Sequence, residues 1–147
     1  MCQAGHMAED LRSVTVNRLD TGVYEATNSR GGRLRFGSRA DDDFTPVELL
    51  LAALAGCSAV DVDQVTSRRA TPDRFEVVVT AAVESGGAGK ILRDIVVAFD
   101  LAFPEGAEGD TARTLAPRAL QISHDRTCTV SRTVQTGVPV RMDLTTG

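Results

Sequence analysis

Aromatic residues and histidine are scarce in this chain of 147 residues, and the chain has no excess of positive charge. It contains no Trp, one Tyr and five Phe, so its core must be built from aliphatic side chains. Acidic residues outnumber basic ones by 20 to 16, which gives a formal net charge of −4. Broad nucleic-acid binding needs a basic face that neutralises phosphates, so the charge argues against a nucleic-acid partner.

Cysteine is also sparse. Three cysteines are too few for a disulfide scaffold, and they suit a reducing cytoplasm in which any disulfide is transient and catalytic. The segment from Met1 to Asp10 lacks the cationic start and apolar run of a secretory signal. Gly5-His6-Met7 resembles the scar of a cleaved tag, so little weight falls on Cys2. We expect residues 1–11 to be disordered or vector-derived, and residues 12–147 to form a single domain.

Motifs for metals and cofactors are missing. His6 and His124 have the wrong spacing to form a metal set with the cysteines, and no metal is expected. The glycine cluster at 86–89 is not followed by the Lys-Ser/Thr of a phosphate-binding loop, so it predicts a turn. The sequence therefore implies neither a metal nor an organic cofactor.

The most apolar stretch of the chain runs from residue 46 to residue 60. It contains Glu48 and is shorter than the roughly 20 apolar residues of a membrane span, so no membrane partner is expected. Thr45 can cap a helix, Pro46 suits its first turn, and Pro72 stops any continuation beyond about residue 69. A helix apolar nearly all round must be covered on all sides, and a partner subunit is expected to supply part of that cover.

Most of the remaining chain predicts strands. Three short strands are expected at 14–16, 23–26 and 34–36, and two longer ones at 75–84 and 91–103 form a hairpin. The apolar faces of the two longer strands are assigned as follows: Phe75, Val77, Val79, Ala81 and Val83 on the first, and Ile91, Ile95, Val97, Phe99 and Leu101 on the second. A second helix is expected over about 111–124, and a closing strand over 138–144.

Cys57 lies inside the apolar helix, where an apolar face becomes polar. Leu50 and Leu54 precede it on the helical surface, and Val60 and Asp61 follow it, an arrangement that suits a pocket floor. An ionised Asp61 would raise the thiol pKa, so a nucleophilic Cys57 needs a compensating cation. The alternative is a buried cysteine that acts as a small hydrophobe.

Cys128 lies in a polar segment without apolar periodicity, and it is therefore expected near the surface. Arg126 and Arg132 flank it and would lower a neighbouring thiol pKa, unless they are solvated surface charges. The alternative for Cys128 is a partly buried cysteine in an irregular turn. Two thiols placed in this way are typical of a two-cysteine redox site.

Two segments resemble motifs of the OsmC/organic hydroperoxide resistance superfamily. The stretch from Thr45 to Val62 resembles the first-helix motif, and residues 119–123 together with 128–131 resemble the second-cysteine motif. The resemblance implies an α+β fold with an antiparallel sheet, a central buried cysteine-bearing helix and an intertwined homodimer. It also implies a thiol peroxidase with Cys57 as the peroxidatic and Cys128 as the resolving cysteine.

The chain departs from the family pattern at one chemical position. Well-characterised peroxidases of the family carry a Glu directly after the helix Pro, and this Glu holds a catalytic Arg. Here Val47 occupies that position, and Glu48 lies on the helix face opposite Cys57. The resemblance places the Arg near the first β-turn, where Arg18 is the candidate. The motif is closer to a less characterised branch of the superfamily.

Two functions remain open from sequence. The first is a cofactor-free peroxidase in which Cys57 reduces an organic hydroperoxide and Cys128 closes a disulfide, which an external dithiol reopens. Leu50, Leu54 and Val60 would then form apolar substrate walls beside Asp61. The second is a non-catalytic dimer that binds a small apolar or thiol ligand and keeps its cysteines unreactive.

Overall fold

The computed structural model describes residues 10–38 and 42–147, and it has an α+β fold. The chain divides into two compact units, Met1–Leu49 and Leu50–Gly147. Cys2 and His6, as well as most of the segment predicted to be vector-derived, lie outside the described residues. The single domain predicted over 12–147 stays a prediction.

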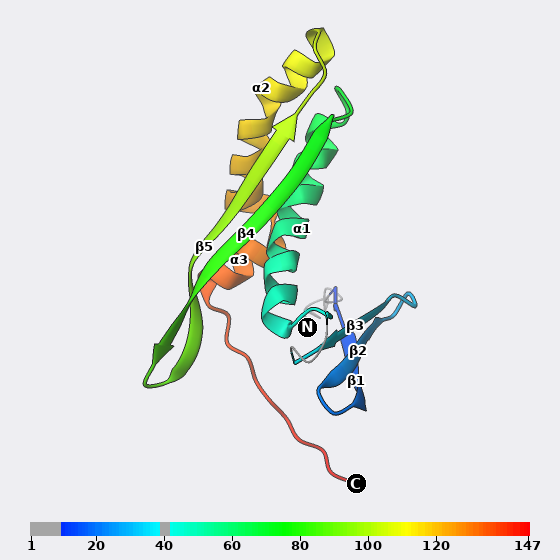
Figure 1. Ribbon diagram of the computed structural model, residues 1–147, viewed down its shortest axis with the longest axis vertical. Helices are drawn as coiled ribbons and strands as arrows, with labels where there is room; N and C mark the ends of the chain where they lie inside the picture. The colour runs from blue at the N-terminus through cyan, green and yellow to red at the C-terminus, as the bar shows by residue number, and fades with distance from the viewer. Residues whose placement is uncertain (1–9, 39–41) are drawn as a thin grey trace, which may run out of the picture. The chain divides into compact units, whose positions relative to one another are not determined.

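The first unit contains a three-stranded antiparallel sheet (Figure 1). Its strands are β1 (Val14–Asp20), β2 (Val23–Asn28) and β3 (Arg33–Gly37), in that order. Cross-strand neighbours Tyr24 and Phe36 stack with ring centroids 5.6 Å apart. The three short strands predicted from sequence are confirmed, each slightly longer than expected.

Helix α1 spans Pro46–Thr66 and carries the predicted start signal. The Glu48 carboxylate accepts a hydrogen bond from the Thr45 N–H at 2.8 Å, and the Thr45 hydroxyl accepts one from the Glu48 N–H at 3.3 Å. This reciprocal pair is a capping box, which satisfies two donors at the helix start. The helix ends at Thr66, a few residues before the predicted end.

Only a narrow stripe of α1 is buried within this chain: Leu54, Ser58, Val62 and Thr66. Among the described residues, α1 is the one helix long and apolar enough to cross a membrane by length and composition, a test that the core helix of a soluble protein also passes. Just 22% of its most apolar window is buried. The cover predicted for the rest of this helix is therefore not supplied by the described part of the chain.

The second unit is built on a long antiparallel hairpin of β4 (Arg74–Gly86) and β5 (Gly89–Ala102). The hairpin and the turn at the glycine cluster are confirmed. The register shifts opposite Thr80–Ala82, where Asp94 adopts a positive φ of 51°. This bulge adds one residue and reverses the alternation beyond it. The predicted inward position of Ile91 is therefore wrong: Ile91 is 52% exposed, and Leu92 is the partly buried residue.

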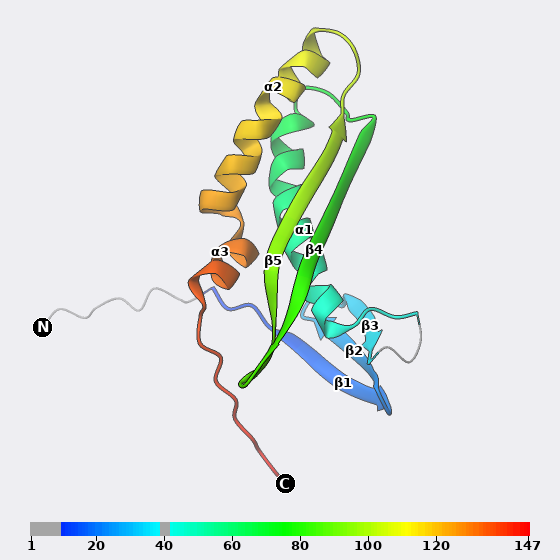
Figure 2. The same ribbon diagram turned by 60° about the vertical axis from the view of Figure 1, so that its left-hand side comes forward.

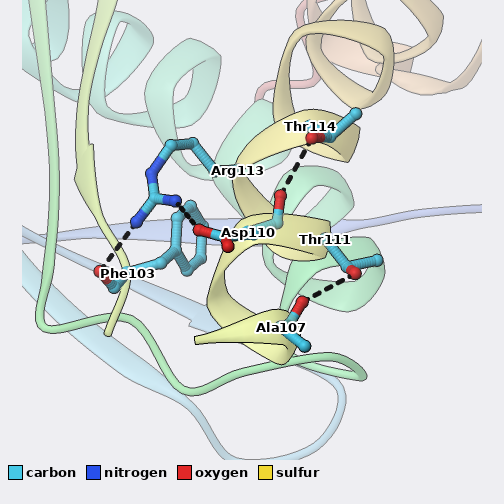
Figure 3. Close-up of polar contacts among 6 residues, drawn as sticks. All are labelled: Phe103, Ala107, Asp110, Thr111, Arg113 and Thr114. Carbon is cyan, nitrogen blue, oxygen red and sulfur yellow. Dashed lines mark hydrogen bonds and ion pairs between the residues drawn. The ribbon is translucent and has the colours of Figure 1, made fainter. Parts of the chain in front are cut away.

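Helices α1 and α2 (Ala107–Ile122) lie side by side along one face of the hairpin (Figures 1 and 2). Small side chains allow this close packing, and the main core cluster comprises Ala70, Phe103, Ala112 and Ala116, with Leu101 against it. Gly109 lies against the chain entering the helix, because a Cβ built on it would be 1.8 Å from the Pro104 carbonyl oxygen. Arg113 also links α2 to the end of β5, because its guanidinium donates hydrogen bonds to the Asp110 carboxylate at 2.6 Å and to the Phe103 carbonyl at 3.1 Å (Figure 3).

Helix α2 begins earlier than predicted, at Ala107 instead of near residue 111, and it continues through Pro117. A proline inside a helix removes one backbone hydrogen bond, here the one to the Arg113 carbonyl. Both residues are exposed, so water can satisfy that carbonyl. Helix α2 also ends earlier than predicted, because the chain changes to a π-helix, η1 (Ser123–Thr127), followed by α3 (Thr129–Thr136).

The closing strand predicted over 138–144 is wrong for this chain. The segment has no regular secondary structure, and its apolar side chains are 57–91% exposed. A strand needs a neighbouring edge for its backbone hydrogen bonds, and none of the strand pairings among the described residues includes this segment. The segment has the period-two pattern of a strand, but none of the described strands pairs with it. The residues of this pattern are Val138, Val140, Met142 and Leu144.

Candidate functional site

The structure brings the two predicted cysteines into contact. Cys57 lies in the middle of α1 and is partly buried, and Cys128 is fully buried at the N-cap of α3. The Cys128 thiol lies close enough to Cys57 to raise the pKa of the Cys57 thiol. The prediction that Cys128 lies near the surface is wrong, because the segment around it is helical and folds its sulfur inward.

The first turn of α3 supplies backbone donors to both sulfurs. The Ser131 N–H donates to the Cys128 sulfur at 3.3 Å, and the Val130 backbone N–H in the same turn lowers the pKa of the Cys57 thiol. The N-terminus of a helix carries a partial positive charge, so it favours negative charge on a nearby atom. Cys57 has no such help from its own helix, but it receives some from α3, a helix that the polar sequence did not predict.

Asp61 connects α1 to the segment that carries Cys128. One of its carboxylate oxygens, Oδ2, accepts hydrogen bonds from the Ser123 hydroxyl at 2.8 Å and from the Thr127 hydroxyl at 2.7 Å. These two residues are the first and last of η1. The sequence indicated Asp61, one turn after Cys57, and Ser123 lies in the second-cysteine motif, but no pattern linked Asp61 to Ser123 and Thr127, which lie 62 and 66 positions away.

Burial is the main reason that the pKa of the Cys57 thiol is raised above its usual value. The hydrogen bond from Val130 lowers this pKa, whereas the neighbouring Cys128 thiol and the Asp61 carboxylate raise it further. The expected direction of the Asp61 effect is therefore confirmed. Within the described part of the chain, no arginine contributes to the shift.

The candidate activating arginines are exposed. Arg18 lies on β1 and donates a hydrogen bond to the Thr21 hydroxyl at 3.0 Å. It belongs to the first unit and Cys57 to the second, so its predicted role stays a prediction. Arg126 and Arg132 flank Cys128 in sequence, and both side chains point to solvent.

Two of the four predicted pocket residues, Leu54 and Asp61, border different cavities. Leu54 is buried and borders a cavity of about 410 Å³ between α1, β5 and α3. Asp61 borders a different cavity of about 320 Å³, whose walls come from α1, α2 and Thr127 and are mainly apolar. Leu50 and Val60 are 40% and 55% exposed. Their role as substrate walls stays a prediction.

Comparison with known proteins places these features in a family. The family model for OsmC-like proteins matches residues 39–143. An uncharacterized protein of Mycobacterium tuberculosis is 32% identical over 136 residues, which cover 91% of this chain and 96% of the relative. An uncharacterized protein of Mycobacterium bovis is equally similar, at 32% identity over the same length.

Solved structures with the same fold include two OsmC-like proteins. One, of unknown function, is from Vibrio cholerae and has a TM-score of 0.68 at 11% identity, with 85% of this chain and 94% of that chain covered. The other is from Mycoplasma pneumoniae and has a TM-score of 0.66 at 17% identity, with 86% and 89% covered. The family model covers both cysteines and the whole of α1. The chain is therefore a member of the OsmC-like protein family.

Proposed function

We propose that the protein is a thiol-dependent peroxidase that reduces organic hydroperoxides. The contact between the Cys57 and Cys128 thiols is the observation that carries the proposal. One thiol is partly exposed and the other is fully buried beside it, which suits a first cysteine that meets the substrate and a second that closes a disulfide. The small number of cysteines supports a reducing cytoplasm as the setting of this chemistry.

The reaction has two steps on the enzyme. The Cys57 thiolate attacks the distal oxygen of the hydroperoxide, and the O–O bond breaks so that Cys57 becomes a sulfenic acid. The departing alkoxide takes up a proton from solvent and leaves as the alcohol. The Cys128 thiolate then attacks the Cys57 sulfur, forms the disulfide and releases water. An external dithiol reduces the disulfide by exchange and restores both thiols.

The comparisons support the same type of chemistry. A structural relative from Bacillus subtilis is an organic hydroperoxide resistance protein, with a TM-score of 0.50 at 14% identity and 84% of this chain covered. Its fold is shared with this chain, and resistance to organic hydroperoxides is consistent with the reaction proposed for Cys57 and Cys128.

The site needs a cation that the second unit does not provide, because burial, Cys128 and Asp61 all raise the pKa of Cys57. We assign this role to Arg18, in the setting of a homodimer. The flank of α1 that this chain leaves open, including Val60 and Val65, is the surface on which the second copy would pack. A dimer would bury this apolar surface and enclose the thiols in a drier site.

The test is stopped-flow measurement of thiol loss driven by an organic hydroperoxide. We expect wild type to lose two thiols per chain and to form the Cys57–Cys128 disulfide, which mass spectrometry identifies. Cys57→Ser should lose none, and Cys128→Ser should stop at a sulfenic acid that dimedone traps. If wild-type thiols survive excess cumene hydroperoxide, as the Cys57→Ser variant does, the peroxidase proposal is wrong.

The second candidate is a non-catalytic dimer that binds a small apolar or thiol ligand. The raised pKa of Cys57 favours it, since a protonated thiol is a poor nucleophile. The same experiment separates the two functions: a binding protein would keep its thiols in hydroperoxide and still bind a thiol ligand. Calorimetry with that ligand would give the affinity.

A further inference from the structure

We propose that Asp61 is a positioning residue for the second step, holding the Cys128 segment against Cys57 through Ser123 and Thr127. The place of this step in peroxide reduction rests on the proposed function. The positioning itself depends only on the contacts between α1 and η1, so it can be tested without a peroxide.

The hydrogen bonds of Asp61 reach both ends of η1. Ser123 begins this π-helix and Thr127 ends it, and both hydroxyls donate to the same Asp61 oxygen at 2.8 and 2.7 Å. Cys128 follows Thr127 directly, and its N–H donates to the Ser123 carbonyl at 2.9 Å. The backbone on both sides of the turn is thus fixed to α1, the helix that bears Cys57.

The local structure explains why this turn needs an external anchor. A π-helix is a rare conformation that forms single turns, so its own backbone hydrogen bonds hold it weakly. The Ser123 side chain is almost fully buried, and its hydroxyl must have a partner there. A hydrogen bond to a carboxylate is stronger than one between neutral groups, so Asp61 is a suitable partner.

Asp61 is not an activating residue for Cys57. A carboxylate near a nucleophilic thiol opposes thiolate formation, so Asp61 does not assist attack by Cys57. Its two hydrogen bonds go to the segment of the other cysteine. The structure thus assigns Asp61 an effect on each thiol: its charge acts on Cys57, and its hydrogen bonds place Cys128.

The two effects can be separated by substitution. Both hydrogen bonds use one oxygen, and the carbonyl oxygen of an asparagine has two lone pairs to accept them. Asp61→Asn therefore removes the charge and keeps an acceptor, whereas Asp61→Ala removes both. Thr127→Val removes one hydrogen bond and leaves the charge. Thr133→Val is the matched control, because this exposed hydroxyl on α3 bonds only within its own helix.

The experiment follows the reaction of the full chain, with Cys2 replaced by Ser, with 5,5′-dithiobis(2-nitrobenzoate). Cys57 attacks the reagent in a bimolecular first phase and releases one thionitrobenzoate, leaving a mixed disulfide on Cys57. The Cys128 thiolate then attacks the Cys57 sulfur, the mixed disulfide breaks, and a second thionitrobenzoate leaves with the electron pair. The rate of this second phase is independent of reagent concentration and measures how well Cys128 is placed.

We expect Asp61→Ala to slow the second phase by about tenfold or more, and Thr127→Val to slow it by roughly threefold, as lost hydrogen bonds of ordinary strength would. Asp61→Asn should restore a rate within about threefold of wild type, and Thr133→Val should match wild type. Circular dichroism checks that each variant is folded. If Asp61→Ala is unfolded, Thr127→Val and Asp61→Asn carry the test.

Equal second-phase rates in wild type, Thr127→Val and any folded Asp61→Ala would overturn the proposal. A second phase in Asp61→Asn as slow as in Asp61→Ala would also overturn it, since the charge and not the hydrogen-bond geometry would then matter. The peroxidase proposal is tested by a different measurement: it fails if the wild-type thiols survive treatment with the hydroperoxide.

Discussion

The pKa of the Cys57 thiol is set by opposing effects of groups that lie close to it in space. Burial, the Cys128 thiol and the Asp61 carboxylate raise its pKa, and the Val130 N–H at the start of α3 lowers it. The net effect is a raised pKa, which keeps the thiol protonated at neutral pH. Any activation must therefore come from a positive charge added to these groups.

The contribution of Asp61 can be measured from the pH dependence of alkylation. Only the thiolate reacts, so the rate rises with pH through the thiol pKa. Since Asp61 raises that pKa, Asp61→Asn should shift the iodoacetamide rate profile of Cys57 to lower pH than in wild type, with both proteins lacking Cys2. Asp63→Asn is the control, because Asp63 is not among the groups that act on Cys57. An unchanged profile in Asp61→Asn would contradict the assignment.

The contribution proposed for Arg18 has the opposite sign. If Arg18 stabilises the Cys57 thiolate in the assembled protein, Arg18→Ala should move the alkylation profile to higher pH and slow peroxide reduction at pH 7. The thiolate fraction falls about tenfold for each unit that the pKa rises. Arg126→Ala and Arg132→Ala should have smaller effects because both side chains point to solvent. A shift in either of these variants, and none in Arg18→Ala, would reassign the activating cation.

At the scale of elements, close packing of α2 depends on one glycine. A side chain at Gly109 would collide with the Pro104 carbonyl, so Gly109→Ala should force the start of α2 away from β5. We expect a loss of about 1–3 kcal/mol in the free energy of unfolding, the usual cost of overpacking. Urea denaturation measures it. Gly87→Ala is the matched control, since nothing lies within 4 Å of its added carbon; equal stability of the two variants would refute the packing argument.

Local patterns predicted the elements better than their ends. The helix cap at Thr45 and the period-two pattern of the hairpin are short-range signals, and both were predicted from sequence. The reciprocal bond from Glu48 was not predicted. The inward position of Leu92 near the end of the hairpin was not predicted, because it depends on the bulge at Asp94. Helix α3 was missed because it is short and polar, and with it the burial of Cys128.

The candidate site shows the same division. The two cysteines and Asp61 were predicted from one helical motif and a second matching segment, each local in sequence. The hydroxyls of Ser123 and Thr127 were not, because their bonds to Asp61 join residues more than sixty positions apart. Contacts of that range depend on how α1, α2 and η1 pack together, which no local pattern encodes.

At the scale of the whole molecule, the exposed flank of α1 is the main unexplained surface. A stripe of this helix is buried, but the apolar side chains of Val60 and Val65 remain exposed. Exposed apolar surface on a central helix costs free energy in water, and a second copy of the chain is the occupant that the proposed function requires. The exposed segment at 138–144, with its period-two pattern, is a second such surface. A strand edge of a second subunit could provide the backbone hydrogen-bond partners that this segment lacks.

The dimer is tested by sedimentation equilibrium at micromolar concentration. We expect a mass of about twice the 15.6 kDa of one chain. Val60→Glu places a charge on the apolar flank, where burial in an interface would leave it without a partner, so it should shift the protein toward monomer and lower its melting temperature. Val78→Glu is the matched control, since Val78 is similarly exposed but lies on β4 and not on α1. A wild-type protein that sediments as a stable, folded monomer would refute the dimer, and Arg18 would then have to reach Cys57 within a single chain.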